Sequence, residues 1–174
     1  MIIREASGQD QAAIRTLYAA AFPAQEAETV AALAVELLAT DTPAFSLVSE
    51  ADGQVFAHIA FSPVCVDDDS GIAGFILAPL AVLPEFQKNG TGSKLVEAGL
   101  DRLVDEGADF VLVYGDPAYY GRFGFDADIA AGFLPPYPLE YPFGWQCRLL
   151  GDRAGGRPPV GISCVAALSR PELW

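Results

Sequence analysis

The feature that most constrains the fold is the stretch of residues 80–96, where an apolar segment leads through a short turn into an amphipathic helix. Two glycines, Gly90 and Gly92, stand where that helix begins. A helix N-terminus carries free N–H groups and a partial positive charge, so it can bind phosphate through the backbone alone. Glycine removes the Cβ atoms that would keep a pyrophosphate away from those groups. The stretch therefore predicts a phosphate-binding turn between a buried strand and a helix.

This turn differs from two familiar phosphate motifs. A P-loop needs Gly-x-x-x-x-Gly-Lys-Ser/Thr, and Lys94 is not next to either glycine in that frame. A dinucleotide fingerprint needs a third small residue where Leu95 stands, and it should lie near the start of a βαβ unit. Taken alone, the turn is read equally well as a glycine-rich helix start that binds no ligand.

The segments that flank the turn predict a parallel βαβ unit. Residues 72–83 and 109–114 are almost continuously apolar, which is typical of strands buried on both faces. Residues 90–106 have helical periodicity, and Gly107 follows as a predicted C-cap. Strand, helical crossover and strand imply that the two strands are parallel. We therefore expect an α/β (α+β) fold, with a mixed central sheet flanked by helices.

Shorter patterns predict the other elements. Ser7 is a predicted N-cap of the first helix, and residues 51–53 form a strong hairpin-turn signal. Residues 40–43 and the proline-rich residues 133–142 are predicted to be loops. The remaining predictions are strands at 1–6, 44–50, 54–63, 146–150 and 160–168, and helices at about 25–39 and 117–123.

Size and composition predict one cytoplasmic domain. The 174 residues are 52% hydrophobic, which indicates an ordered chain that we expect to form a single domain over residues 1–174. No apolar run is long enough to span a bilayer, and the N-terminus is predicted to be a strand rather than a signal peptide. The three cysteines, Cys65, Cys147 and Cys164, suggest neither a disulfide framework nor a zinc site. We expect no metal.

The charge of the chain bears on its partners. The formal net charge is −13, which disfavours nucleic acids and anionic membranes because phosphate binding rests on Lys and Arg. An acidic surface suits a cationic substrate such as an amine. The same charge is also explained by solubility alone.

Two motifs resemble those of a known family. Leu80, Val82, Pro84, Phe86, Gln87, Gly90 and Gly92 resemble the acetyl-CoA-binding motif of the GNAT family of N-acetyltransferases. Downstream, residues 119–125 resemble the aromatic-Tyr-x-x-x-Gly-Phe signature of that family, and residues 115–125 resemble its YhbS-like subgroup more closely. The resemblance is strongest over about residues 53–126.

The resemblance implies a GNAT fold and the transfer of acetyl from acetyl-CoA to an amine on a small molecule, a peptide or a protein. It implies that the N–H groups near Ala81 and Val82 receive the thioester oxygen, freed by a bulge in the strand. The positions carried over as acetyl-CoA-binding are Leu80, Ala81, Val82, Gln87, Lys88, Asn89, Gly90, Thr91, Gly92, Ser93 and Tyr120.

The resemblance also implies catalytic residues. Tyr120 matches the usual general acid of the family, and a phenol with a pKa near ~10 is protonated at neutral pH. Glu26 and Glu28 stand early in a helix where the family places acceptor-binding residues and, in some members, the base. His58, the sole histidine, has a pKa range that suits a base. Each has a structural alternative: a packed tyrosine, solvated glutamates and a structural strand histidine.

Two other functions stay open at this point. The fold would also suit a CoA-binding sensor or interaction domain without catalysis, and the turn would suit a nucleotide-binding protein. The loop at residues 133–142 is expected to wall the acceptor side of the cleft or to pack on a second subunit of a homodimer. A loop that covers its own core is the alternative.

Overall fold

The computed structural model describes residues 1–39 and 41–174, so Thr40 of the predicted 40–43 loop lies outside the described residues. The chain divides into two compact units. The first comprises Met1–Phe61 and Ala78–Leu100, and the second comprises Ser62–Leu77 and Asp101–Trp174. One domain over residues 1–174 stays a prediction.

The first unit is built on antiparallel strands. β1 (Ile2–Glu5) pairs with β2 (Phe45–Ala51), which pairs with β3 (Gln54–Val66), and β4 (Gly74–Val82) is the next strand of the sheet. Asp52 and Gly53 join β2 to β3 with φ angles of 51° and 77°. Two successive left-handed residues fit the twist of a tight hairpin, which confirms the predicted turn.

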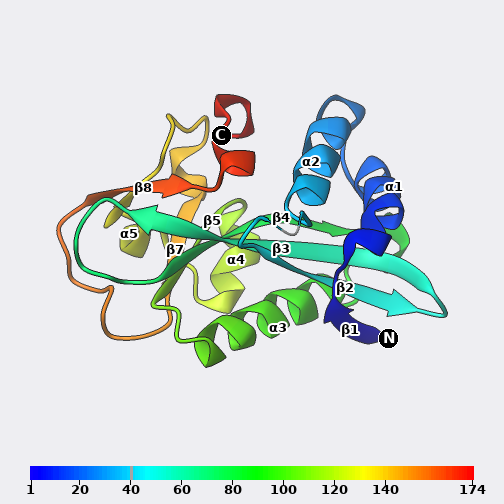
Figure 1. Ribbon diagram of the computed structural model, residues 1–174, viewed down its shortest axis with the longest axis horizontal. Coiled ribbons are helices and arrows are strands. Elements are labelled where there is room, and N and C mark those ends of the chain that lie inside the picture. The colour runs from blue at the N-terminus through cyan, green and yellow to red at the C-terminus, as the bar shows by residue number, and fades with distance from the viewer. Residues whose placement is uncertain (40) are drawn as a thin grey trace. The chain divides into compact units, whose positions relative to one another are not determined.

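Helices cover both faces of this sheet. α1 (Gln11–Ala21) and α2 (Ala24–Glu36) lie on one side of β2 and β3, and α3 (Thr91–Asp105) lies on the other (Figure 1). Side chains alternate between the faces of a strand, so His58 meets Tyr18 of α1 whereas Phe61 points toward α3. A Cβ at Gly99 would lie 2.1 Å from the Phe61 ring, so glycine lets α3 approach the sheet closely.

The second unit contains the parallel pair. Gly74–Leu77 of β4 pair in parallel with β5 (Phe110–Tyr114), which confirms the predicted βαβ unit. β5 then pairs antiparallel with β7 (Trp145–Leu149). β8 (Val160–Cys164) pairs antiparallel with the end of β3 and parallel with the two-residue β6 (Phe133–Leu134). The sheet is therefore mixed, as predicted.

Two short helices complete the second unit, α4 (Pro117–Tyr120) and α5 (Ala127–Ala130). The Oδ1 atom of Asp116 accepts a hydrogen bond from the N–H of Ala118 at 2.9 Å and so caps α4. Among the described helices, none combines the length and the apolar character that a membrane span requires.

Three of the boundaries that were predicted wrongly have a clear physical reason. The helix predicted to reach residue 39 ends at Glu36, because the N–H groups of Leu38 and Ala39 bond carbonyls three residues back in tighter turns. The strand predicted at 160–168 ends at Cys164, where pairing with β3 stops and a 3₁₀ turn follows. The strand predicted to end at residue 63 continues to Val66. Pro63 lies between the part of β3 that pairs with β2 and the part that pairs with β8, so no N–H of residue 63 is needed on that edge of β3.

Candidate functional site

The predicted phosphate turn follows β4 directly, within the first unit. A 3₁₀ turn at Pro84–Phe86 comes first, residues 87–90 are then exposed, and α3 begins at Thr91. The backbone is left-handed at Lys88, with φ 60°, and at Gly90, with φ 86°. The Oδ1 atom of Asn89 accepts hydrogen bonds from the N–H and Oγ1 of Thr91, at 3.2 Å and 2.6 Å. These bonds fix the turn at the helix entrance.

Free backbone donors gather at this entrance. The N–H groups of Gly92 and Ser93 make no hydrogen bond in the part of the chain that the structure describes. Left-handed residues between extended or helical ones turn successive N–H groups toward one concavity, which is an arrangement that binds anions. A Cβ at Gly90 would meet no atom of the described residues within 4 Å, so glycine is favoured there by the positive φ rather than by a lack of space.

The end of β4 leaves part of its main chain without a parallel partner. In the described residues, the ladder between β4 and β5 covers Gly74–Leu77, although β4 continues to Val82. Ala81 is buried, whereas Leu80 and Val82 are half-buried. The carbonyl of Val82 accepts a hydrogen bond from Nε2 of Gln87 at 2.9 Å. The predicted thioester-binding residues thus lie on a strand edge that the parallel ladder does not reach.

Tyr120 ends α4, in the second unit. Its ring contacts Tyr119 and Phe125 at centroid distances of 4.9 Å and 5.9 Å. A Cβ at Gly115 would lie 2.5 Å from Cε2 of Tyr120, so the glycine makes room for the ring. The hydroxyl makes no hydrogen bond among the described residues. Burial raises the pKa of Tyr120 above its ordinary value, and the neighbouring Tyr119 raises it further by a smaller amount. The phenol is therefore protonated at neutral pH.

His58 lies inside the first unit, away from solvent. Its side chain is 0% exposed, and Nδ1 is 2.9 Å from the hydroxyl of the equally buried Tyr18. Nε2 has no partner among the described residues. Burial lowers the pKa of His58 from 6.5 to about 3, although the nearby Asp10 carboxylate opposes the shift. The imidazole is neutral at physiological pH, but it is remote from bulk water.

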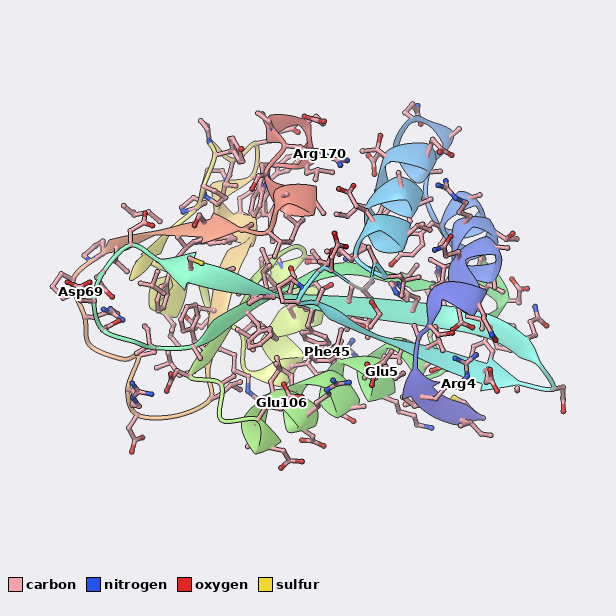
Figure 2. All side chains as sticks on the ribbon, in the orientation of Figure 1. Arg4, Glu5, Phe45, Asp69, Glu106 and Arg170 are labelled. Atoms are coloured by element: carbon pink, nitrogen blue, oxygen red, sulfur yellow. The ribbon has the colours of Figure 1, made fainter. Side chains whose placement is uncertain are left out.

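Asp10 belongs to an ion cluster at β1. Arg4, labelled in Figure 2, donates to Asp10 at 3.0 Å and 2.8 Å and to Glu50 at 2.9 Å and 2.6 Å. Hydrogen bonding from Arg4 lowers the pKa of Asp10 to about 2. Asp10 therefore stays charged throughout the pH range in which an ordinary histidine titrates.

The burial of His58 predicts that the free energy of unfolding decreases as the pH falls below about 6.5. The unfolded chain then protonates His58 while the folded chain does not, so the free energy of unfolding drops by about 1.4 kcal/mol per pH unit down to the folded pKa. Unfolding of the parent by urea between pH 7 and pH 5 should show this slope. His58→Gln should flatten it, whereas Tyr18→Phe, which keeps the histidine, should retain it. Equal slopes for the parent and His58→Gln would contradict the assignment.

The two predicted glutamates of α2 differ in their surroundings. Oε1 of Glu28 is 3.2 Å from Nη1 of Arg15 on α1, and the Glu28 side chain is 86% exposed. Glu26 lies in the first turn of α2 and makes no ion pair within the described residues. Of the two, Glu26 keeps a carboxylate that is not engaged by a cation.

The segment at residues 133–142 was predicted to be a loop, but it begins with the two-residue strand β6. At its start, Phe133 is buried and stacks on Phe110 at 4.1 Å, and its carbonyl accepts a bond from Nε1 of Trp145 at 2.7 Å. Leu134 and Tyr141 are 51% and 53% exposed. The start thus covers the core of the second unit. Contact of the exposed part with an acceptor or a second subunit stays a prediction.

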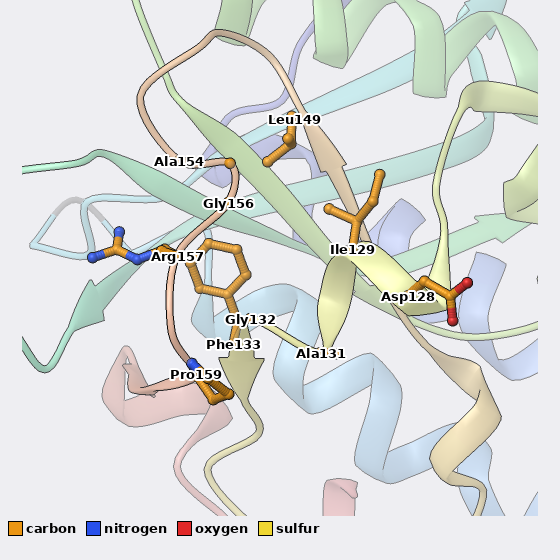
Figure 3. A pocket seen from close by; sticks show the side chains of 11 residues that line it. Asp128, Ile129, Ala131, Gly132, Phe133, Leu149, Ala154, Gly156, Arg157 and Pro159 are labelled. Carbon is orange, nitrogen blue, oxygen red and sulfur yellow. The ribbon is translucent and has the colours of Figure 1, made fainter.

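One cavity lies wholly within the second unit, next to this loop (Figure 3). Its volume is about 340 Å³, and the Arg157 guanidinium on its wall is paired with Asp68. The lining includes Asp128, Ile129, Phe133, Leu149, Arg157 and Pro159. None of the predicted acetyl-CoA-binding or catalytic residues lines it.

The structure thus gathers the predicted cofactor residues, apart from Tyr120, on one continuous segment of the first unit. That unit also holds Glu26, Glu28 and His58, whereas Tyr120 belongs to the second. Sequence reasoning missed Tyr18 as the partner of His58, although its place on the apolar face of α1 was a usable signal. It also missed Phe56, whose ring stacks on Phe86 of the turn.

Comparison with known proteins finds one family. The model of the acetyltransferase (GNAT) family matches residues 12–125. The uncharacterised N-acetyltransferase YjhQ of Escherichia coli strain K12 is 35% identical over 147 residues, which are 81% of this chain and 80% of that protein. The uncharacterised N-acetyltransferase YhbS of the same strain is 40% identical over 80 residues, but these span only 46% of this chain and 47% of YhbS.

Two solved structures resemble the chain over nearly its whole length. YhbS from Escherichia coli, crystallised in complex with CoA, has a TM-score of 0.84 at 30% identity, covering 97% of this chain and 92% of that one. A GNAT family acetyltransferase from Brucella melitensis in complex with acetyl-CoA has a TM-score of 0.73 at 34% identity, covering 95% and 96%. Both are similar to this chain in fold; the first was crystallised with CoA and the second with acetyl-CoA.

Proposed function

Because the chain belongs to the acetyltransferase (GNAT) family, we propose that it transfers acetyl from acetyl-CoA to an amine. The observation that carries the proposal is the pair of N–H groups, of Gly92 and Ser93, that make no hydrogen bond among the described residues at the start of α3, after the left-handed Lys88 and Gly90. These groups fit a pyrophosphate, because they supply donors in one concavity without a side chain.

The proposed roles follow the chemistry of acyl transfer. The amine nitrogen attacks the thioester carbonyl, an oxyanion forms, and the C–S bond then breaks to release a thiolate. Main-chain N–H groups at Ala81 and Val82 would stabilise the oxyanion, and Leu80 would contribute main chain to the same strand edge. Gln87 to Ser93 would hold the phosphates. Tyr120 would supply the proton that the thiolate gains.

The base is assigned by its surroundings. A group that takes a proton from a substrate amine must reach it directly or through one water. Glu26 is exposed and makes no ion pair within the described residues, whereas Glu28 is paired with Arg15 and His58 is enclosed. We therefore rank Glu26 first as base and Glu28 as an acceptor-binding carboxylate, and we assign the enclosed His58 a structural role.

One observation favours a second function, a CoA-binding domain without turnover. The sole histidine of the chain is fully buried, and burial lowers its pKa to about 3, far below the range of an efficient base at neutral pH. Such a domain would bind acetyl-CoA with the same turn but release no CoA.

Melting temperatures measured with different ligands should distinguish a protein that binds acetyl-CoA, with or without turnover, from a nucleotide-binding protein. Acetyl-CoA at about 100 times its dissociation constant stabilises a folded protein by about 2.7 kcal/mol. For a chain of this size the melting temperature should rise by about 5–10 °C. NAD and ATP at the same concentration should leave it unchanged. A rise with ATP and none with acetyl-CoA would overturn the proposal.

Turnover is tested on a panel of amines by following the release of free CoA thiol. The panel should include polyamines, amino acid amides, and peptides with free N-termini or lysines. Release above the rate of hydrolysis with at least one amine supports the enzyme. Binding of acetyl-CoA with no release across the panel favours the domain without turnover.

A further inference from the structure

The phosphate turn must keep its shape without being buried. Residues 87–90 are all exposed, and the backbone of Lys88 has a left-handed conformation that residues other than glycine rarely adopt. Such a conformation costs about 1 kcal/mol or more and persists only when surrounding contacts impose it. The contacts that impose it therefore matter for phosphate binding, even where they touch no phosphate.

One residue of β3, Phe56, supplies two of these contacts. Its carbonyl accepts a hydrogen bond from the N–H of Leu83 at 2.9 Å, where the chain leaves β4. Its ring stacks on Phe86 with centroids 4.4 Å apart and planes 22° apart. Phe56 is 3% exposed, whereas Phe86 is half-buried beside the exposed turn. Both ends of the short Pro84–Phe86 helix thus rest on the same residue.

We infer that Phe56 is a positioning residue for the phosphate turn, acting through the ring of Phe86. The inference rests on the proposed function, because the turn must bind CoA for its shape to matter. The exposed turn begins at Gln87, directly after Phe86. If the Phe86 ring no longer rests on Phe56, Gln87 is therefore expected to shift with it. Side chains at 56 that are apolar but not aromatic would fill the core and lose the stack.

A second aromatic pair in the same unit provides a matched control. Phe45, labelled in Figure 2, stacks on Phe61 with centroids 5.1 Å apart and planes 15° apart, and it is 7% exposed. Phe45 begins β2, and its stacking partner Phe61 belongs to β3 rather than to the Pro84–Phe86 turn. Phe45→Leu therefore removes a similar buried stack at a similar cost in stability without touching Phe86.

The experiment measures the dissociation constant of CoA by calorimetry for the full chain and its variants. Phe56→Leu should weaken binding by about 3- to 10-fold, the range expected for loss of one aromatic stack. Phe86→Leu should do the same, and the double variant should lose no more than either single variant, because both remove one interaction. Phe86→Tyr, which keeps the ring at a half-exposed position, should bind like the parent. Phe45→Leu should lower the melting temperature but leave CoA affinity unchanged.

The outcomes separate this inference from the proposed function. A parent that binds no CoA overturns both. A parent that binds CoA while Phe56→Leu and Phe86→Leu bind it equally well overturns the positioning role alone. So does an equal loss in Phe45→Leu, since stability rather than the stack would then set affinity. If Phe56→Leu does not fold, Phe86→Leu decides the question from the exposed side of the stack.

Discussion

Replacing Gly92 by glutamate is expected to weaken acetyl-CoA binding by at least ~100-fold while leaving the protein folded. The new carboxylate would stand in the first turn of α3, beside the N–H groups of Gly92 and Ser93 that are proposed to receive the pyrophosphate. Like charges about 4 Å apart at a protein surface repel by ~4 kcal/mol, which exceeds the ~2.7 kcal/mol that a 100-fold loss requires.

The same substitution should not harm the fold. Glycine is among the poorest helix formers, and a carboxylate in a first helical turn is favoured by the helix dipole. The melting temperature without ligand should therefore stay level or rise. This opposite sign for stability and affinity distinguishes a lost phosphate site from a damaged protein.

Two further variants divide the effect of Gly92→Glu into bulk and charge. Gly92→Gln has nearly the same volume without the charge, and Gly92→Ala adds only a Cβ. Titration calorimetry should rank the CoA affinities as parent, then alanine, then glutamine, then glutamate. A folded glutamate variant with the affinity of the parent would remove the turn from the CoA site.

Local sequence determined the turn, and this is why it was predictable. A buried strand, two glycines and an amphipathic helix fall within residues 80–96, so no distant contact is needed to infer a phosphate-binding helix start. The parallel pairing of β4 and β5 followed from the order of neighbouring elements. The reason for Gly90 did need the structure, because φ is not visible in a sequence.

Contacts between distant residues were not predictable in the same way. Tyr18 and His58 are 40 positions apart, and only their hydrogen bond shows that the imidazole is enclosed rather than presented to a substrate. The stack of Phe56 on Phe86 joins β3 to the 3₁₀ turn after β4, which lies 30 positions further along the chain. The ladder between β4 and β5 stops at Leu77 while both segments remain apolar, so no residue pattern marks its end.

Replacing Tyr120 by phenylalanine is expected to lower kcat by at least ~100-fold on a confirmed amine acceptor. The Tyr120 hydroxyl has no hydrogen-bond partner among the described residues, and burial raises its pKa, so it remains a proton donor beyond pH ~10. A thiol with a pKa near ~8.5 leaves as a fairly stable thiolate, which keeps the loss toward the lower end of the ~10²–10⁴-fold range for acid–base catalysis. Because the ring stays, acetyl-CoA affinity should change little.

Gly115→Ala offers an independent check on Tyr120, because it leaves the phenol in the chain but displaces it. The added Cβ would lie 2.5 Å from Cε2 and 3.0 Å from Cδ2 of the Tyr120 ring, so the ring must move. Steady-state kinetics should then show a fall in kcat with little change in the KM for acetyl-CoA. If Tyr120→Phe turns over as fast as the parent, the general-acid role is wrong. If it loses acetyl-CoA binding together with activity, Tyr120 acts through packing, and the thiolate must take its proton from another donor, such as an ordered water.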